Sequence, residues 1–122
     1  MNPALSVLIV DDNAKMRSMI AEIIRSKASN ILECNDGMDA LGEYSLHRPD
    51  WVLMDAQMNN MDGLKATELI RRFFPKAKVM IVSQDDDQDM RDAAQHAGAQ
   101  AFVSKNNLLD ILNNFNQSPM GS

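Results

Sequence analysis

The chain is short of cysteine, of long apolar runs and of positive charge, and each shortage excludes a class of protein. Cys34 is the only cysteine among 122 residues, so an internal disulfide framework is excluded and a reducing compartment is expected. No apolar run approaches the roughly 20 residues that a membrane span needs. The segment Met1–Leu5 lacks the features of a signal peptide. We therefore expect a cytoplasmic protein without a membrane segment.

Positive charge is also scarce, with 12 Lys and Arg against 17 Asp and Glu, which leaves a net charge of −5. A nucleic-acid-binding domain usually presents a basic face, so direct nucleic acid binding by this domain is not expected. The length suits one domain with a single core. Hydrophobic residues make up 45% and charged residues 24% of the chain, which is ordinary for a globular protein.

Apolar periodicity predicts five strands that alternate with five helices. The predicted strands are Leu5–Val10, Asn30–Cys34, Trp51–Asp55, Lys78–Ser83 and Gln100–Ser104. The predicted helices occupy about 16–24, 38–45, 64–74, 85–97 and 108–115. Residues 59–63 carry turn chemistry, and Gly98 is the expected C-terminal cap of the fourth helix.

This alternation predicts an α/β fold: a doubly wound, five-stranded parallel sheet covered by helices on both faces. The expected strand order is the flavodoxin-like 2-1-3-4-5, in which ligands bind between strands 1 and 3 at the carboxyl edge. We expect the domain to span residues 1–117. Residues 118–122 are then a disordered tail, a linker or a cloning remnant.

Polar residues of matching chemistry follow four of the five strands. Asp11 and Asp12 follow the first strand and Asp55 ends the third, so three carboxylates are expected at the switch point. Mg²⁺ prefers such oxygen ligands, and the backbone carbonyl of Gln57 could complete the site. Asp55 could also accept a phosphoryl group as an acyl phosphate.

Two further residues at the same edge suit a phosphoryl group. Ser83 ends the fourth strand and Lys105 follows the fifth, so a hydroxyl donor and a cation are available for phosphoryl oxygens. Singly, each of these residues is usually a helix cap, a turn residue or a solvated lysine. Their joint order along the chain is much more specific.

With these residues in place, the chain resembles a response-regulator receiver domain of the CheY-like family. The resemblance rests on four stretches that cover nearly the whole chain: VLIVDDNAKMR (7–17), DWVLMDAQMNNMDG (50–63), KVMIVS (78–83) and HAGAQAFVSK (96–105). It implies that Asp55 is the phosphoacceptor and that Asp11, Asp12, Asp55 and the Gln57 carbonyl hold Mg²⁺. It also implies a catalytic role for Lys105 and switch roles for Ser83 and Phe102.

The resemblance implies a partner and a readout as well. The phosphodonor would be a histidine kinase or a phosphotransfer protein, and the surface of the fourth helix, fifth strand and fifth helix would contact an output domain or target. A homodimer through that surface is left open. The chemistry would be self-phosphorylation and slow hydrolysis at Asp55, without enzymatic turnover.

The sequence departs from the family pattern at several positions. Asn59 and Asn106 stand where proline is usual in the family. Some receiver subfamilies with helix-turn-helix outputs also lack the second proline, so the chain could be the receiver of such a regulator. Gln84 replaces a small residue next to Ser83. We hypothesise that Gln57, Gln84 and Asp85 modulate the lifetime of the phosphorylated form.

Two other functions remain open at this point. One is a phosphate-independent interaction module that keeps the receiver fold. The other is a phosphohydrolase with an aspartyl nucleophile, which is opposed by Gln57 at the position where such enzymes usually carry a second acid.

Overall fold

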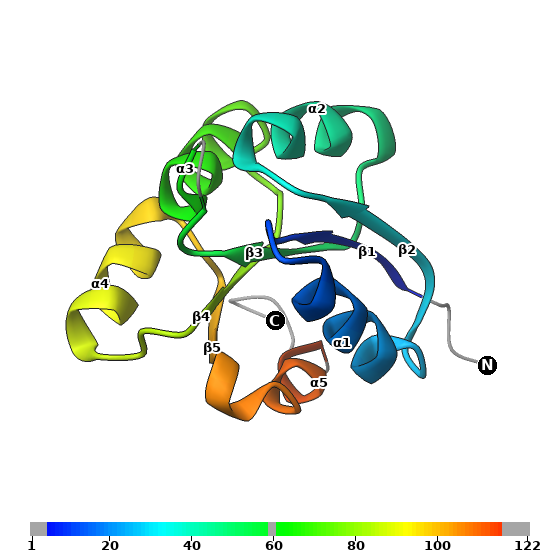
Figure 1. Cartoon of the computed structure of the whole chain (residues 1–122). Helices are drawn as coiled ribbons and strands as arrows, with labels where there is room; N and C mark the ends of the chain where they lie inside the picture. The colour runs from blue at the N-terminus through cyan, green and yellow to red at the C-terminus, as the bar shows by residue number, and fades with distance from the viewer. Residues whose placement is uncertain (1–4, 59–60, 116–122) are drawn as a thin grey trace.

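Five parallel strands form one sheet in the order β2-β1-β3-β4-β5 (Figure 1). The structure is a computed structural model, and it describes residues 5–58 and 61–115. The strands are β1 (Leu5–Val10), β2 (Ala28–Cys34), β3 (Trp51–Asp55), β4 (Val79–Ser83) and β5 (Ala101–Ser104). The predicted fold class and strand order are confirmed.

Helices cover both faces of the sheet. They are α1 (Ala14–Ile24), α2 (Gly37–His47), α3 (Gly63–Phe73), α4 (Gln88–Ala97) and α5 (Asp110–Phe115), with a 3₁₀ turn, η1, at Lys105–Asn107. Figure 1 shows α2 and α3 above the sheet, α1 and α5 below it, and α4 beside α3. Two apolar clusters fill the two layers, one under α2, α3 and α4 and one under α1 and α5.

The local sequence explains where most of these elements lie. Every residue of β3 and β4 is buried, as expected for central parallel strands that have helices on both faces. Four helices begin at an Asn or Asp whose side chain accepts a hydrogen bond from a backbone N–H of the first turn, as N-cap residues do. These caps are Asn13, Asp36, Asp62 and Asp87.

Some predicted boundaries differ from the structure. Strand β2 begins at Ala28, because Ala28 pairs with Leu5 of β1, and β4 and β5 each begin one residue later than predicted. Helix α5 begins at Asp110, because the chain first forms η1. Of the predicted turn 59–63, residues 59 and 60 lie outside the described residues, as does the whole segment 118–122.

The connections after β1 and β3 diverge, which creates the switch point. After β1 the chain enters α1, which packs on one apolar cluster, and after β3 it enters α3, which packs on the other.

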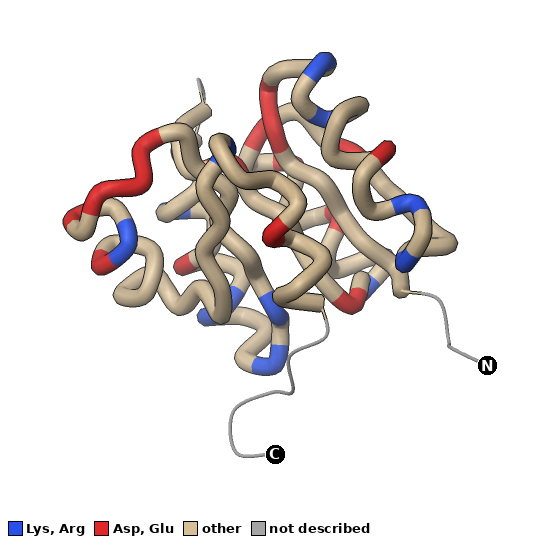
Figure 2. The backbone as a smooth tube through the Cα atoms, turned by 90° about the horizontal axis from the view of Figure 1, so that it is seen from below, with Lys and Arg blue, Asp and Glu red and all other residues tan. Residues whose placement is uncertain are grey.

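Acidic residues concentrate near the loops at the carboxyl edge. The long red stretch at the left of Figure 2 is the run Asp85–Asp87 ahead of α4. Among the described residues, no helix has the length and apolar character needed to cross a membrane.

Candidate functional site

Asp11 and Asp12 lie at the carboxyl end of β1 and differ in environment. Asp11 is only 1% exposed, whereas Asp12 is exposed. The backbone N–H of Asp11 donates to the Cys34 carbonyl oxygen at 3.2 Å. Its Oδ1 accepts from the backbone N–H of Asn13 at 2.8 Å. The Asp11 carboxylate is therefore held in one orientation at the edge of the sheet.

Asp55 is the last residue of β3 and lies beside Asp11. Its neighbour Met54 pairs with Val10 of β1, so β1 and β3 end side by side. Asp55 is 6% exposed, and its Oδ1 accepts from the backbone N–H of Gln57 at 3.3 Å. Asp55 thus reaches the predicted position with a carboxylate that is almost fully buried.

Gly63 allows α3 to begin directly against the end of β3. Its N–H donates to the Ala56 carbonyl oxygen at 2.9 Å. A Cβ built at Gly63 would clash with the Asp55 carbonyl oxygen and lie 2.7 Å from the Asp55 carbonyl carbon. Only glycine permits so close an approach of the two backbones. The sequence pattern predicts Gly63 only as a turn residue and gives no signal of this contact.

Lys105 joins the two buried acids, which confirms that it is not a solvated surface lysine. Its Nζ lies 3.1 Å from Asp11 Oδ2 and 3.2 Å from Asp55 Oδ1. The lysine reaches this point because β5 is paired with β4 and Lys105 directly follows β5. Its side chain is 15% exposed, so the ammonium is largely withdrawn from water.

The electrostatics of the site follow from this crowding. Burial and the neighbouring Asp11 carboxylate raise the pKa of Asp55, while Lys105 and the Gln57 N–H oppose the rise without cancelling it. Burial disfavours the ammonium of Lys105, but the Asp55 and Asp11 carboxylates outweigh it and raise the pKa of Lys105. The site therefore holds a surplus of negative charge that a cation would relieve.

The three acids could hold a metal ion. One carboxylate oxygen each from Asp11, Asp12 and Asp55 lies within 4.8 Å of the others. A set of hard oxygen donors with an exposed member suits Mg²⁺, which keeps several waters. Gln57 is exposed and two residues from Asp55. Its backbone carbonyl as a fourth ligand stays a prediction.

Ser83 lies at the end of β4, next to the strand that carries Asp55. It is 1% exposed, and its Oγ accepts from the backbone N–H of Asp85 at 3.1 Å. The side chains of Gln84 and Asp85 are exposed. Ser83 is thus a buried hydroxyl tied to the loop that leads into α4.

Phe102 lies on β5, partly buried against the apolar cluster under α2, α3 and α4. The guanidinium carbon of Arg91 lies 4.7 Å from the centre of its ring. The same Arg91 donates from Nε to the Asp86 carbonyl oxygen at 3.1 Å. Arg91 therefore connects the loop after Ser83 to the aromatic ring, a contact that no sequence signal had indicated.

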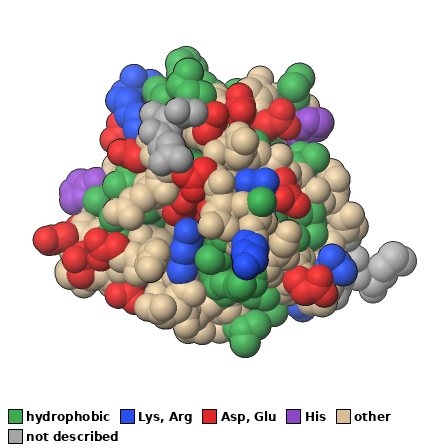
Figure 3. Space-filling model, in the orientation of Figure 1, with side chains coloured by type: hydrophobic (Ala, Val, Ile, Leu, Met, Phe, Trp, Pro, Cys, Tyr) green, Lys and Arg blue, Asp and Glu red, His purple; other side chains and the backbone are tan. Residues whose placement is uncertain are grey.

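Figure 3 shows acidic and basic side chains side by side near the middle of the face that it presents. The predicted site residues with charged or hydroxyl side chains lie at the ends of strands, along one edge of a single parallel sheet. They are Asp11, Asp12, Asp55, Ser83 and Lys105. The fold and the site therefore define a class of protein: an α/β domain with two buried acids paired to a largely shielded lysine at the switch point of its sheet.

Comparison with known proteins identifies the family. The family described as "Response regulator receiver domain" matches residues 7–115, so the chain belongs to the response-regulator receiver domain family. It is 37% identical to the chemotaxis protein CheY of Bacillus subtilis over 100 residues, which are 81% of this chain and 83% of that protein.

Solved structures agree with this assignment. A CheX–CheY–BeF₃–Mg²⁺ complex from Borrelia burgdorferi matches with a TM-score of 0.82 and 27% identity, covering 93% of this chain and 90% of that one. A LuxR-family response regulator from Aurantimonas matches with a TM-score of 0.87 and 24% identity over 93% of this chain and 83% of that one. The second match shows the shared fold alone.

Proposed function

We propose that this chain is a phosphorylation-controlled receiver in which Asp55 accepts a phosphoryl group with the aid of Mg²⁺. The observation that carries the proposal is the bridge of Lys105 between the buried carboxylates of Asp11 and Asp55, at 3.1 and 3.2 Å. The two buried acids share this one cation, so one negative charge stays uncompensated, and a buried charge without its own partner costs stability. Such a group at the end of a strand is better explained by chemistry than by packing.

In the proposed transfer, a carboxylate oxygen of Asp55 forms a bond to phosphorus. The bond from phosphorus to the donor atom breaks, and its electron pair stays with the donor. Lys105 lies where it can neutralise an oxygen of the incoming group once Asp55 has become an acyl phosphate. When bound at Asp11, Asp12 and Asp55, Mg²⁺ would supply further neutralisation of phosphoryl charge.

Ser83 and Arg91 suggest how the change would be read. A hydroxyl can accept one hydrogen bond and donate another. Ser83 can therefore donate to a phosphoryl oxygen while it still accepts from the N–H of Asp85. Movement of Ser83 would pull the 83–87 loop, and Arg91 would pass this movement from the Asp86 carbonyl to the ring of Phe102.

The partner and the limits of the activity belong to the same proposal. The phosphodonor would be a histidine kinase or a phosphotransfer protein, and the α4–β5–α5 surface would contact the target or output domain. The chemistry would be confined to gain and loss of phosphoryl at Asp55, with no separate substrate. The exposed Gln57, Gln84 and Asp85 would modulate its lifetime.

The test is phosphorylation by acetyl phosphate with Mg²⁺, followed by intact-mass spectrometry. The wild type should gain the mass of one phosphoryl group, and Asp55→Asn should gain none. Omission of Mg²⁺ with EDTA present should abolish the gain. Equal labelling of both proteins would overturn the assignment of Asp55, and no labelling of either would favour the phosphate-independent interaction module.

A further inference from the structure

Arg17 of α1 turns back toward the end of β1 and makes two charge-assisted hydrogen bonds. Its Nη1 donates to the backbone carbonyl oxygen of Asp11 at 2.7 Å. Its Nε donates to Oε1 of Glu33, on β2, at 2.9 Å. The Arg17 side chain is 18% exposed, so these contacts are partly shielded from water. Nothing in the proposed transfer uses this residue.

The carbonyl that Arg17 holds belongs to the peptide bond between Asp11 and Asp12. Because a peptide unit is planar, fixing its carbonyl oxygen fixes the direction in which the chain leaves toward Asp12. Asp11 is also held through its own N–H and carboxylate. Asp12 lies beyond β1 and is exposed, so the orientation of this peptide matters for where its carboxylate is presented.

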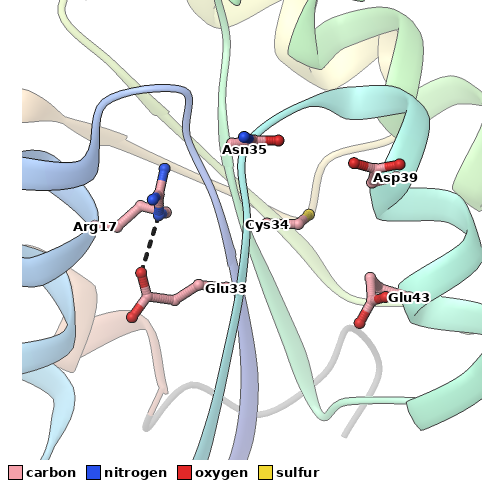
Figure 4. Close-up of a pocket in the computed structure, with 6 residues that line it drawn as sticks. All are labelled: Arg17, Glu33, Cys34, Asn35, Asp39 and Glu43. Atoms are coloured by element: carbon pink, nitrogen blue, oxygen red, sulfur yellow. Dashed lines mark hydrogen bonds and ion pairs between the residues drawn. The ribbon is translucent and has the colours of Figure 1, made fainter.

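Glu33 orients the Arg17 guanidinium by accepting its Nε–H. Figure 4 shows this pair on one side of an open hollow of about 380 Å³ and Asp39 and Glu43 on the other side. A guanidinium is a rigid fork whose nitrogens point in fixed directions. With Nε bound to Glu33, Nη1 is aimed at the Asp11 carbonyl. The pairing also offsets the positive charge of Arg17, which would otherwise oppose a nearby cation.

We propose that Arg17 is a positioning residue for the divalent-cation site, acting through the Asp11–Asp12 peptide and itself oriented by Glu33. The inference rests on the proposed function, because it assumes that Asp11, Asp12 and Asp55 bind Mg²⁺. It assigns to α1 and β2 a part in metal binding that the three acids alone do not reveal.

The key variant is Arg17→Lys, which keeps the charge but not the fork. Its single ammonium nitrogen cannot take the places of both guanidinium nitrogens. Loss of a group that orients metal ligands typically weakens metal binding about 10- to 100-fold, and here we expect about tenfold. The matched control is Arg25→Lys, since Arg25 forms an exposed ion pair with Glu22 just beyond the other end of α1.

Two measurements on the full chain test the proposal. The first is calorimetric titration with Mg²⁺ alone. The second is metal-free amide hydrogen exchange in EDTA at Asp12 and Asn13, which reports the loop without any metal. Arg17→Lys should bind Mg²⁺ about tenfold more weakly and exchange faster at these two amides. Arg25→Lys should match the wild type in both measurements.

The contrary outcomes separate this inference from the proposed function. If the wild type binds Mg²⁺ and is phosphorylated, but Arg17→Lys retains wild-type Mg²⁺ affinity, the positioning role is wrong and the receiver function stands. If Arg17→Lys weakens Mg²⁺ binding without faster exchange at Asp12 and Asn13, the peptide-orienting mechanism is wrong. If the wild type neither binds Mg²⁺ nor gains a phosphoryl group, the proposed function fails and takes this inference with it.

Discussion

At the scale of single residues, Asp55 is an acid kept in a position that costs stability. It is 6% exposed, and burial and Asp11 raise its pKa above the usual 3.8. Only one cation, Lys105, is paired with the two buried carboxylates among the described residues. Active sites commonly sacrifice stability for function in this way.

We expect Asp55→Asn to stabilise the metal-free protein at neutral pH, because burial and the Asp11 carboxylate, which raise the pKa of Asp55, disfavour its ionised form. The folded pKa of Asp55 is raised, so the folded state holds its proton more tightly than the unfolded state does. The wild-type penalty is therefore absent below about pH 3.8 and grows as pH rises through the folded pKa. Urea unfolding of both proteins in EDTA, at pH values from about 3.5 to about 7, measures this difference in the free energy of unfolding.

The control for this prediction is Glu68→Gln, which neutralises an exposed acid on α3. It should change the free energy of unfolding by less than about 0.5 kcal/mol. A variant Asp55→Asn that is less stable than the wild type at neutral pH, or a difference that does not depend on pH, would show that Asp55 is not under electrostatic strain.

At the scale of elements, the junction between β3 and α3 places Asp55. The two backbones approach so closely at Gly63 that a methyl group would lie 2.7 Å from the Asp55 carbonyl carbon and 2.9 Å from Met54 Cγ. Gly42, in α2, is a natural comparison because a Cβ there meets nothing within 4 Å.

Alanine at these two glycines should have opposite effects. Gly63→Ala should destabilise by about 3 kcal/mol, because backbone atoms at the clash cannot move aside as a side chain would. Gly42→Ala should stabilise by about 0.5–1 kcal/mol, the ordinary gain in a helix interior. Chemical unfolding of both variants measures this. Shifts of the same sign would contradict the close approach at Gly63.

The contact between α4 and β5 can be tested as an interaction energy. Arg91 lies over the ring of Phe102 at 4.7 Å, and a cation–π contact at a partly exposed site is worth about 0.5–1 kcal/mol. A double-mutant cycle of Arg91→Ala and Phe102→Leu should give a coupling of that size. The cycle of Arg72→Ala, on α3, with Phe102→Leu should give none. Zero coupling in the first cycle would exclude the Arg91 link.

The positions of most helices and strands could be predicted from the sequence, because apolar runs and Asn or Asp caps are local signals. The fully buried β3 and β4 read as continuous apolar runs. Gly98 is the C-terminal cap of α4, as predicted, and its φ is 101°. The start of β2 depends on its pairing with β1, which the local sequence does not encode. The late start of α5 reflects the η1 turn, where the Ser104 hydroxyl accepts from the N–H of Asn106.

At the scale of the whole molecule, topology turns separate residues into one site. Strand order alone predicted that Asp11 and Asp55 would be neighbours, and the ion pairs of Lys105 bear this out. Arg17, Gly63 and Arg91 could not be predicted in the same way. Their roles depend on backbone atoms, such as the carbonyls of Asp11, Asp55 and Asp86, whose positions only the folded chain defines.

A series of contacts links the site to the proposed readout surface. It runs from the end of β4 to β5 through Ser83, the Asp85 N–H, the Asp86 carbonyl, Arg91 and Phe102. The cycle of Arg91 with Phe102 measures one link of the series.

The central claim is that Asp55 becomes an acyl phosphate, and chemical trapping tests it most directly. Borohydride reduces an acyl phosphate at the carbonyl carbon and releases phosphate, which leaves an alcohol in place of the side-chain carboxylate. After treatment with acetyl phosphate, Mg²⁺ and borohydride, peptide sequencing by tandem mass spectrometry should find the reduced side chain at position 55 alone. Reduction at Asp11 or Asp12, or no reduction in a protein that does gain a phosphoryl group, would contradict the account.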